Sequence, residues 1–266
     1  MTNTIRYKTM KKDKAIFTIC HIETFFLPRW INYYSAFFEN EDIYVLLHND
    51  NTVLNNVNAV YISTSDLFDH KWLRNTVQNF QRKLLQSYEC VVFAEIDEFI
   101  YSLDVPLDEN INRFLSDESC QYQTVTGYDI IQDLDNEPSL SYELSEKIIK
   151  NRKYRVKRDL NIKHVSDKTL ITKIPLKYSV GFHCLEDGDK MIKGPYNFQM
   201  VHLHKIDWEM TKARQIERLD MPLKKDDAGG IHNKKPLDMK YWLGKNNTKE
   251  NWELIPEIVR ERLADL

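Results

Sequence analysis

The stretch that decides the fold class of this chain is Val91-Val92-Phe93-Ala94-Glu95-Ile96-Asp97-Glu98-Phe99-Ile100. Apolar residues lead directly into three acids, and apolar residues resume after them. The run Cys90–Ala94 predicts a strand that is buried on both faces, as in a parallel sheet. A buried strand cannot hold unpaired carboxylates, so we expect the acids at its carboxyl end, where open α/β sheets bind ligands.

The acids in this stretch have the spacing of a cation site. Glu95 and Asp97 are separated by one residue, so in an extended chain their side chains point the same way. Two carboxylates on one side at a sheet edge suit a divalent cation with hard oxygen ligands, of the kind that holds nucleotide phosphates. Glu98 points to the other face, as an orienting group or as a surface acid. The alternative for the whole cluster is a solvated acidic turn.

Strand-like and helix-like patterns alternate on the amino-terminal side of this stretch. They predict strands at Ala15–Cys20, Ile43–Leu47 and Val60–Ile62, and helices at Phe25–Phe38 and His70–Leu85. Such alternation is typical of βαβ units, which form a mainly parallel sheet with right-handed crossovers. The sequence therefore predicts an α/β protein.

The second half of the chain has a different pattern. It predicts strands at Gln121–Thr126, Leu170–Ile174, Tyr178–Leu185 and Asn197–His204, a turn at Glu186–Asp189, and helical segments at Trp208–Leu223, Tyr241–Leu243 and Asn251–Leu266. Neither an internal repeat nor a low-complexity linker divides the chain. One α/β domain over residues 1–266, with an elaborated second half, is the simplest organisation.

The composition excludes several classes of protein. With 42% hydrophobic residues the chain can form a sizeable core, and a net charge of −3 argues against nucleic-acid binding over the whole surface. Only 7 glycines are present, which disfavours glycine-rich phosphate loops. The cysteines form no Cys-x-x-Cys pair and the amino terminus is polar, so we expect a cytoplasmic protein with reduced thiols. The cysteines are Cys20, Cys90, Cys120 and Cys184.

Five segments, in order, resemble glycosyltransferases of the GT-A fold, most closely those of glycosyltransferase family 92 and family 2-like enzymes. The acid motif resembles the Asp-x-Asp-Glu-Phe metal motif of that group, with the longer Glu95 in place of the first aspartate. The resemblance spans roughly residues 15–210. The segments are Glu23–Tyr34 (with Phe-Leu-Pro-x-Trp), Phe80–Leu85 followed by Tyr88–Ile100, Lys168–Lys173, Ser179–His183 and Val201–Asp207.

The resemblance implies a fold and an activity. The fold would be a Rossmann-like, nucleotide-sugar-binding domain with a mainly parallel central sheet, a smaller mixed β region and carboxyl-terminal helices. Its nucleotide-binding half would span residues 15–105, its acceptor-side half 106–210, and a helical extension 211–266. The activity would be metal-dependent transfer of a sugar, with inversion, from a UDP-, GDP- or dTDP-linked donor to a glycan or lipid-linked saccharide.

The resemblance also implies the metal site. Asp97 is the best ligand for Mn²⁺ or Mg²⁺, with Glu95 as a second ligand or as a contact to the ribose. His202 and His204 share one face of a strand and would supply a third ligand; imidazole suits Mn²⁺ rather than Mg²⁺. The alternative for each histidine is a hydrogen-bonded structural residue.

The remaining candidates concern the substrates. Nucleotide contacts are expected from Thr18, Glu23, Asp50, Arg82 and Glu95, and substrate contacts from His183 and Glu98. Asp50 is otherwise a turn residue, and Arg82 a solvated helix residue. The general base of an inverting transferase is expected to be Asp129 or Asp187, although Asp187 is also compatible with a hairpin tip.

Two other functions stay open. A nucleotidyltransferase also places acids after a buried strand, but usually adds a glycine-rich loop, and this chain has none. A non-catalytic nucleotide-sugar or glycan-binding module would tolerate Glu95 in place of aspartate. The basic stretch Glu146–Asp159 is either a solvated loop or a contact for phosphate, an acidic acceptor or the inner face of a membrane.

Overall fold

A computed structural model describes residues 10–63, 69–157, 159–160, 163–164, 167–186, 194–220 and 249–266, and the structural statements below concern these residues. The helices are α1 (Phe26–Tyr34), α2 (His70–Leu84), α3 (Leu107–Ser116), α4 (Trp208–Asp220) and α7 (Glu257–Arg262). The strands are β1 (Lys12–Cys20), β2 (Ile43–His48), β3 (Asn58–Ile62), β4 (Tyr88–Phe93), β5 (Glu98–Ser102), β6 (Tyr122–Ile131), β7 (Tyr154–Val156), β8 (Asp159–Leu160), β9 (Lys163–His164), β10 (Lys168–Thr172), β11 (Phe198–His202) and β12 (Glu253–Leu254).

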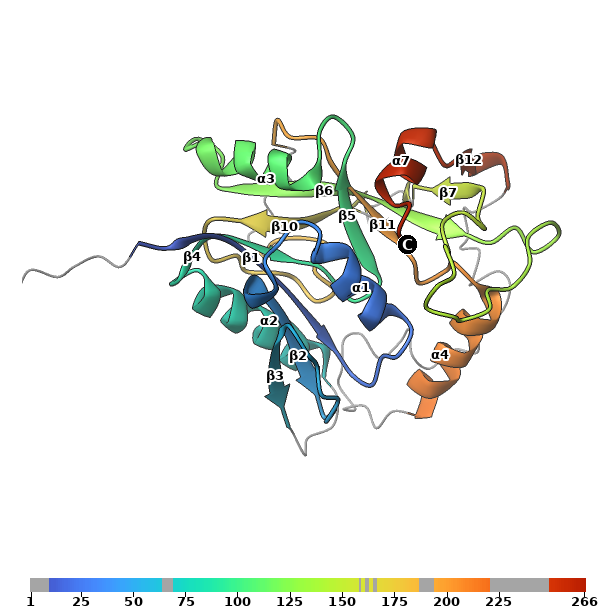
Figure 1. Ribbon diagram of the computed structural model, residues 1–266, viewed down its shortest axis with the longest axis horizontal. Helices are drawn as coiled ribbons and strands as arrows, with labels where there is room; N and C mark the ends of the chain where they lie inside the picture. Colours follow the sequence, from blue (N-terminus) through green and yellow to red (C-terminus); the bar gives the residue numbers. More distant parts are fainter. Residues whose placement is uncertain are drawn as a thin grey trace, which may run out of the picture.

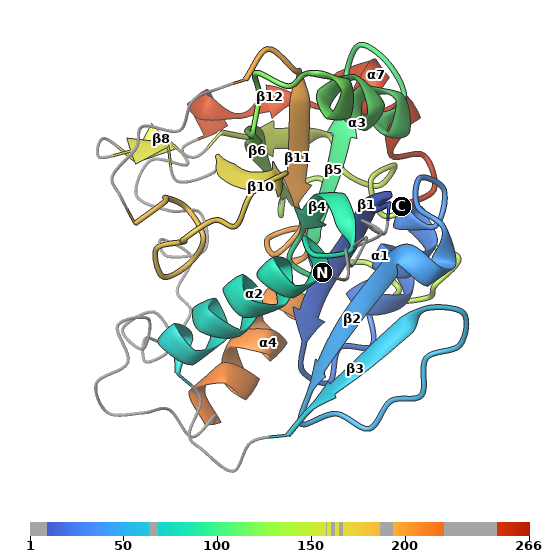
Figure 2. The same ribbon diagram turned by 90° about the vertical axis from the view of Figure 1, so that its left-hand side faces the viewer.

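A large mixed sheet forms the centre of the molecule (Figure 1). Its order is β12-β7-β6-β10-β4-β1-β2-β3, in which β3, β2, β1 and β4 are parallel neighbours and β10 is antiparallel to both β4 and β6. Figure 2 shows β2 and β3 extending this parallel part beyond β1. The expected α/β class with a mainly parallel amino-terminal sheet is therefore confirmed.

The parallel part is held by apolar strands with little solvent access. Ile16 of β1 pairs with Ile43 on one side and Val92 on the other, and all three side chains are buried. A strand that is buried on both faces reads as a continuous apolar run, which is why β4 could be predicted from Cys90–Ala94. At the amino terminus of α2, the Asp69 side chain accepts a hydrogen bond from the backbone of Lys71 and caps the helix.

A smaller group of strands joins the sheet at β6. Strand β11 pairs antiparallel with β5 and parallel with β6, and the register places His202 opposite both Glu98 and Asp129. Helices α3 and α7 contact β5 from outside (Figure 2). This register brings side chains from three distant parts of the sequence to one place.

Two expectations about the second half are wrong. Tyr178–Leu185 is not a strand, because Gly181 and Phe182 adopt positive φ angles of 85° and 63° and only one bridge, Tyr178 to Leu185, forms. The segment Asn251–Leu266 is not continuously helical, since β12 precedes α7. Segments 187–189 and 241–243 lie outside the described residues. No helix in the described part of the chain has both the length and the apolar character to cross a membrane.

Candidate functional site

The site lies where the direction of the sheet connections reverses. The chain proceeds outward from β1 to β2 and β3, and then returns to place β4 on the other side of β1. Ligands of open α/β sheets bind outside the carboxyl ends of the strands at such a point. Here those ends lead into His21–Glu23 after β1 and Ala94–Asp97 after β4.

The loop between β4 and β5 has a fixed shape. The amide of Glu98 donates to the carbonyl of Glu95 at 3.0 Å, which closes a tight turn around Asp97. The amide of Leu203 donates to the carbonyl of Asp97 at 2.8 Å and ties the loop to the end of β11. The backbone thus holds Asp97 beside the histidines that follow in the sequence a hundred residues later.

Asp97 is a nearly buried carboxylate between two cationic groups. Its Oδ2 accepts a hydrogen bond from Arg214 Nη1 at 3.0 Å, and its Oδ1 lies 3.5 Å from His202 Nε2. Burial alone opposes ionisation, but the charges of His202 and Arg214 outweigh it and hold the pKa of Asp97 well below its usual value. Asp97 is therefore a permanent negative charge at neutral pH.

Asp129, His202 and His204 form a compact group of metal-ligand type. Asp129 Oδ1 lies 3.3 Å from His202 Nδ1 and 3.7 Å from His204 Nδ1, and the two Nδ1 atoms are 3.1 Å apart. The three ligand atoms all lie within 4.8 Å of one another. Ligands about 2.1 Å from a first-row metal ion are roughly 3 Å apart when they subtend a right angle at it, so this group fits such an ion.

His202 belongs to both arrangements, because its two ring nitrogens face different acids. Burial lowers the pKa of His202, but Asp97 and Asp129 more than compensate and raise it to about 9. His202 is therefore an imidazolium at neutral pH in the metal-free protein. A metal ion would have to displace that proton, since only the neutral ring coordinates.

Lys168 of β10 pairs with the other two acids of the motif, Glu95 and Glu98. Its ammonium group contacts Glu95 and lies 2.6 Å from Glu98 Oε1, while Glu98 Oε2 accepts from the amide of Glu95 at 3.0 Å. Burial opposes ionisation of Glu95, but Lys168 lowers its pKa, whereas burial leaves the pKa of Glu98 raised. Glu95, expected to bind metal or ribose, is thus engaged by Lys168.

The candidates at the ends of β1 and β2 are mostly built into the turns. Asp50 Oδ1 accepts from the amide of Thr52 at 2.9 Å, and Oδ2 from the amide of Ile22 at 3.2 Å, so this carboxylate joins two loops. Glu23 accepts from the amide of Phe25 at 2.9 Å, at the start of α1. Thr18 is fully buried in β1 and has no surface for a ligand.

Aromatic rings that were not among the predicted site residues lie beside these turns. The His48 ring lies 4.5 Å from the Trp72 ring, and His21 Nδ1 is 2.6 Å from the carbonyl of His48. Trp72 comes from α2. The position of His48 at the carboxyl end of β2 was the available signal, because that is the ligand-binding edge of the sheet.

The structure separates Arg82 from the acids. Arg82 is exposed near the end of α2 and donates to Asn79 at 3.1 Å. Helix α2 ends at Leu84 and leads into the amino end of β4, whereas the acids follow its carboxyl end. Arg82 thus has the geometry of the solvated helix residue that was the alternative to a nucleotide contact.

The two remaining candidates are His183 and Asp187. His183 lies in a loop that reaches the carboxyl end of β4, because the ring of its neighbour Phe182 lies 4.9 Å from that of Phe93. Asp187 lies outside the described residues.

The cations Lys168, Lys205 and Arg214 all contact acids of the site and were not among the predicted site residues. Lys168 and Lys205 do fall within the segments that carry the resemblance.

The basic stretch does not form a continuous surface. Arg152 is fully buried, donates to the carbonyl of Pro138 at 3.0 Å and lies 3.3 Å from Asp207 Oδ2. Arg155 is nearly buried, donates to Glu253 at 2.8 Å, and stacks 3.9 Å from the centre of the Tyr128 ring. These two arginines hold the fold together, so they offer no contact to a membrane or an acidic acceptor.

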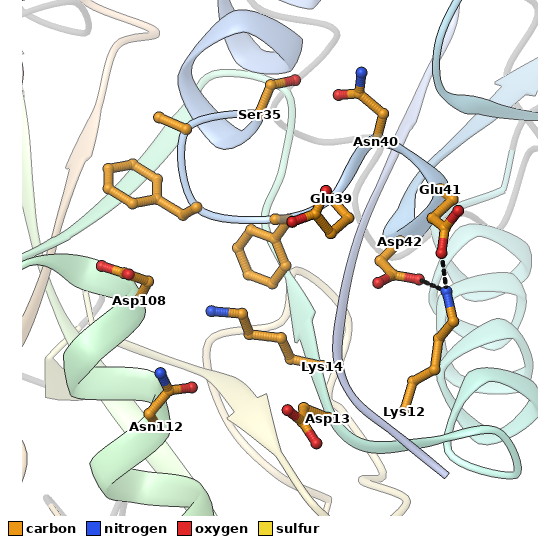
Figure 3. A pocket seen from close by; sticks show the side chains of 13 residues that line it. Lys12, Asp13, Lys14, Ser35, Glu39, Asn40, Glu41, Asp42, Asp108 and Asn112 are labelled. Carbon is orange, nitrogen blue, oxygen red and sulfur yellow. Dashed lines mark hydrogen bonds and ion pairs between the residues drawn. The ribbon is translucent and has the colours of Figure 1, made fainter.

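A cavity of about 870 Å³ lies at the opposite end of β1 (Figure 3). Lys12 and Lys14 from the start of β1 line it together with Glu39 and Asp42, and Lys12 forms ion pairs with Glu41 and Asp42 at 2.5 and 2.8 Å. The cavity is at the amino end of the parallel strands, so it is separate from the acid and histidine cluster.

Comparison with models of known protein families gives no match for this chain. Comparison with characterised proteins gives no match either.

Proposed function

We propose that this protein is a metal-dependent glycosyltransferase of the GT-A type, which transfers a sugar from a nucleoside diphosphate sugar to a hydroxyl of a glycan or lipid-linked saccharide, with inversion. The observation that carries the proposal is the convergence of Asp97, Asp129, His202 and His204 at the carboxyl end of β4. The parallel order of β3, β2, β1 and β4 supports it, because open α/β sheets bind their ligands at the carboxyl ends of the strands where the connections reverse.

The residues of the site divide into two groups in this proposal. Asp129, His202 and His204 would hold the ion, with the carboxylate of Asp97 facing the other ring nitrogen of His202, and the imidazole donors favour Mn²⁺ over Mg²⁺. When bound, the ion supplies a Lewis acid for the negative charge of the leaving diphosphate. Asp50 keeps the turns after β1 and β2 in place, so that the part-exposed ring of Trp72, packed on the buried His48, can receive the nucleoside.

This proposal gives Asp129 the role of a ligand. Asp129 is 1% exposed and faces His202, His204 and Lys205, so it has no open side toward an acceptor hydroxyl. A general base must reach the proton that it abstracts. Asp187 is the remaining candidate for the base.

Binding measurements test the proposal directly. Titration of the protein with Mn²⁺, followed by UDP-, GDP- and dTDP-sugars, is expected to give tight binding of one donor only when Mn²⁺ is present. Product analysis by NMR is expected to show slow hydrolysis of that donor and faster transfer to a saccharide acceptor. Equal donor binding in Mn²⁺ and in EDTA would contradict the metal role.

One observation favours a second candidate, a non-catalytic module that binds a nucleotide sugar. Glu95 and Asp97 already have protein cations beside them, Lys168 and Arg214, so they are neutralised without a metal ion. Such a module would bind the donor tightly in EDTA and would neither hydrolyse nor transfer the sugar. The same experiment therefore separates the two candidates.

A further inference from the structure

Arg214 reaches the acid motif from the carboxyl-terminal part of the chain. It lies on α4, and its Nη1 donates to Asp97 Oδ2 at 3.0 Å while its Nη2 lies 3.7 Å from Glu23 Oε2. The guanidinium packs 5.1 Å from the centre of the Phe26 ring, on the first turn of α1. The loops after β1 and β4 and the helices α1 and α4 thus meet at one arginine.

Arg214 differs from the other cations of the site in its access to solvent. The Lys168 and Lys205 side chains are 3% and 8% exposed and face Glu98 and Asp129. The Arg214 side chain is 21% exposed, although it contacts the same cluster of acids. Of these three, Arg214 is the cation that an incoming anion can reach.

We propose that Arg214 binds the diphosphate of the donor and couples anion binding to metal binding, an inference that rests on the proposed function. A guanidinium presents five donors in a planar fork that matches two phosphate oxygens. Asp97 and Glu23 face only the two terminal nitrogens, each of which also carries a second hydrogen. The guanidinium of Arg214 can therefore donate hydrogen bonds to an anion without a change of rotamer.

The coupling follows from charge. A divalent ion in the group Asp129, His202 and His204 would add positive charge beside Asp97, the carboxylate that the guanidinium of Arg214 contacts. The two cations repel each other in a partly buried site until an anion lies between them. Each ligand then raises the affinity for the other by the same factor, as linkage requires.

The experiment compares Arg214→Met and Arg214→Lys with Lys212→Met as a matched control. Lys212 lies on the same helix, is 43% exposed and pairs with Glu209 at 2.6 Å, so its removal changes the net charge equally without touching the acid cluster. Thermal melts first establish that each variant is folded. The probes are Mn²⁺ alone, followed by electron paramagnetic resonance, and inorganic pyrophosphate, UDP, GDP and dTDP by calorimetry at saturating Mn²⁺.

Arg214→Met is expected to bind Mn²⁺ alone about three- to tenfold more tightly than the wild type, because a repelling charge is gone. It is expected to bind pyrophosphate and the nucleoside diphosphate with Mn²⁺ about 10- to 100-fold more weakly, because charged hydrogen bonds are lost. Arg214→Lys should fall between these values, and Lys212→Met should match the wild type.

Three outcomes would overturn the inference. They are unchanged diphosphate affinity in Arg214→Met, an equal loss in Lys212→Met, and a parallel loss of Mn²⁺ and diphosphate binding that indicates a structural role. A wild type that binds neither pyrophosphate nor any nucleoside diphosphate would also overturn it. If Mn²⁺ and pyrophosphate bind through Arg214 but no nucleotide sugar is used, the inference stands and the proposed glycosyl transfer fails.

Discussion

Asp97 is the acid of the motif that the structure leaves most open to a metal ion. Glu95 and Glu98 share Lys168, whereas Asp97 faces Arg214 and a histidine that can become a ligand. Asp97→Asn keeps the size of the side chain and removes its charge. We expect the affinity for Mn²⁺ to fall at least tenfold, measured by electron paramagnetic resonance.

The control for this variant is Asp265→Asn. The Asp265 side chain is 81% exposed and pairs with Lys147, far along the chain from the motif. Its substitution removes one negative charge and should leave Mn²⁺ binding unchanged. Equal affinities in Asp97→Asn and the wild type would remove Asp97 from the metal site.

His202 makes the stability of the metal-free protein depend on pH. Its pKa in the folded protein is about 9, above the value of about 6.5 in an unfolded chain. The charged ring of His202 therefore contributes its full stabilisation of the fold below pH 6.5, and this stabilisation is lost as the pH rises through 9. We expect the free energy of unfolding in EDTA to decrease by on the order of 2 kcal/mol between pH 6.5 and pH 9.5.

Urea titrations at several pH values measure this decrease. His202→Asn lacks a titrating ring, so its stability should change much less over the same interval. A wild-type protein that is equally stable at both ends of the interval would show that Asp97 and Asp129 do not hold His202 in its charged form.

The sequence could identify the acids and histidines of the site, but not the cations that neutralise them. Asp97, His202 and His204 lie in short motifs, and their chemistry follows from residue type. Lys168 and Arg214 are ordinary charged residues of a strand and a helix in the sequence. Their role depends on which elements meet in space, and local periodicity contains no information about that.

At the scale of elements, β10 is fixed to the β4–β5 loop by a buried ion pair. Lys168→Met leaves the fully buried Glu98 without its cation. We expect a loss of about 3 to 5 kcal/mol in the free energy of unfolding, as is typical when one partner of a buried pair is removed. Chemical denaturation of the purified variant measures this loss.

The double variant Lys168→Met with Glu98→Gln provides the control. It removes the ammonium and the fully buried carboxylate and leaves only the part-exposed Glu95 without its cation, so much of the lost stability should return. If the loss of unfolding free energy in the double variant equals the sum of the losses in the two single variants, then Lys168 stabilises the protein through the packing of its side chain and not through its ion pair with Glu98.

The elements that could be predicted are those whose pattern is decided locally. Short apolar runs predict the strands β1, β2 and β4, and helical spacing of apolar residues predicts α2. Strand β5 was missed because it begins with Glu98, and its role depends on pairing with β11, a hundred residues later. The strand expected at Tyr178–Leu185 fails because of two positive φ angles, which an apolar pattern does not reveal.

At the scale of the whole molecule, ligand binding should appear as stabilisation of the entire fold. The site is assembled from β1, β4, β6, β11 and α4, so a ligand that binds it does not bind the unfolded chain. At a ligand concentration 100 times the dissociation constant, the gain is about 2.7 kcal/mol. We expect the melting temperature to rise by about 5 °C or more with Mn²⁺ and the correct nucleoside diphosphate together.

Differential scanning calorimetry with each ligand alone and with both ligands tests this expectation. If Arg214 couples the two sites, the joint shift should exceed the sum of the separate shifts. A full shift with the nucleotide in EDTA would favour the binding module. The shift should be absent in Asp97→Asn.

Only the parallel part of the sheet could be predicted from the sequence. Alternation of strands and helices implies parallel pairing, but the insertion of antiparallel β10 between β4 and β6 follows from no local signal. The same is true of β11, which leaves the main order and pairs with β5 and β6. These long-range pairings decide where His202 lies, so the complete site became visible only in three dimensions.

The double pairing of β11 limits how this protein can change in evolution. Because neighbours on both edges fix the strand, the deletion of one residue inside β11, between Phe198 and His202, would move His202 to the opposite face of the strand relative to Phe198. Substitutions on the outer surface leave that register intact, whereas changes of length inside β11 do not. We therefore expect related proteins to vary in many surface residues but to keep the spacing from β11 to His204 without insertion or deletion.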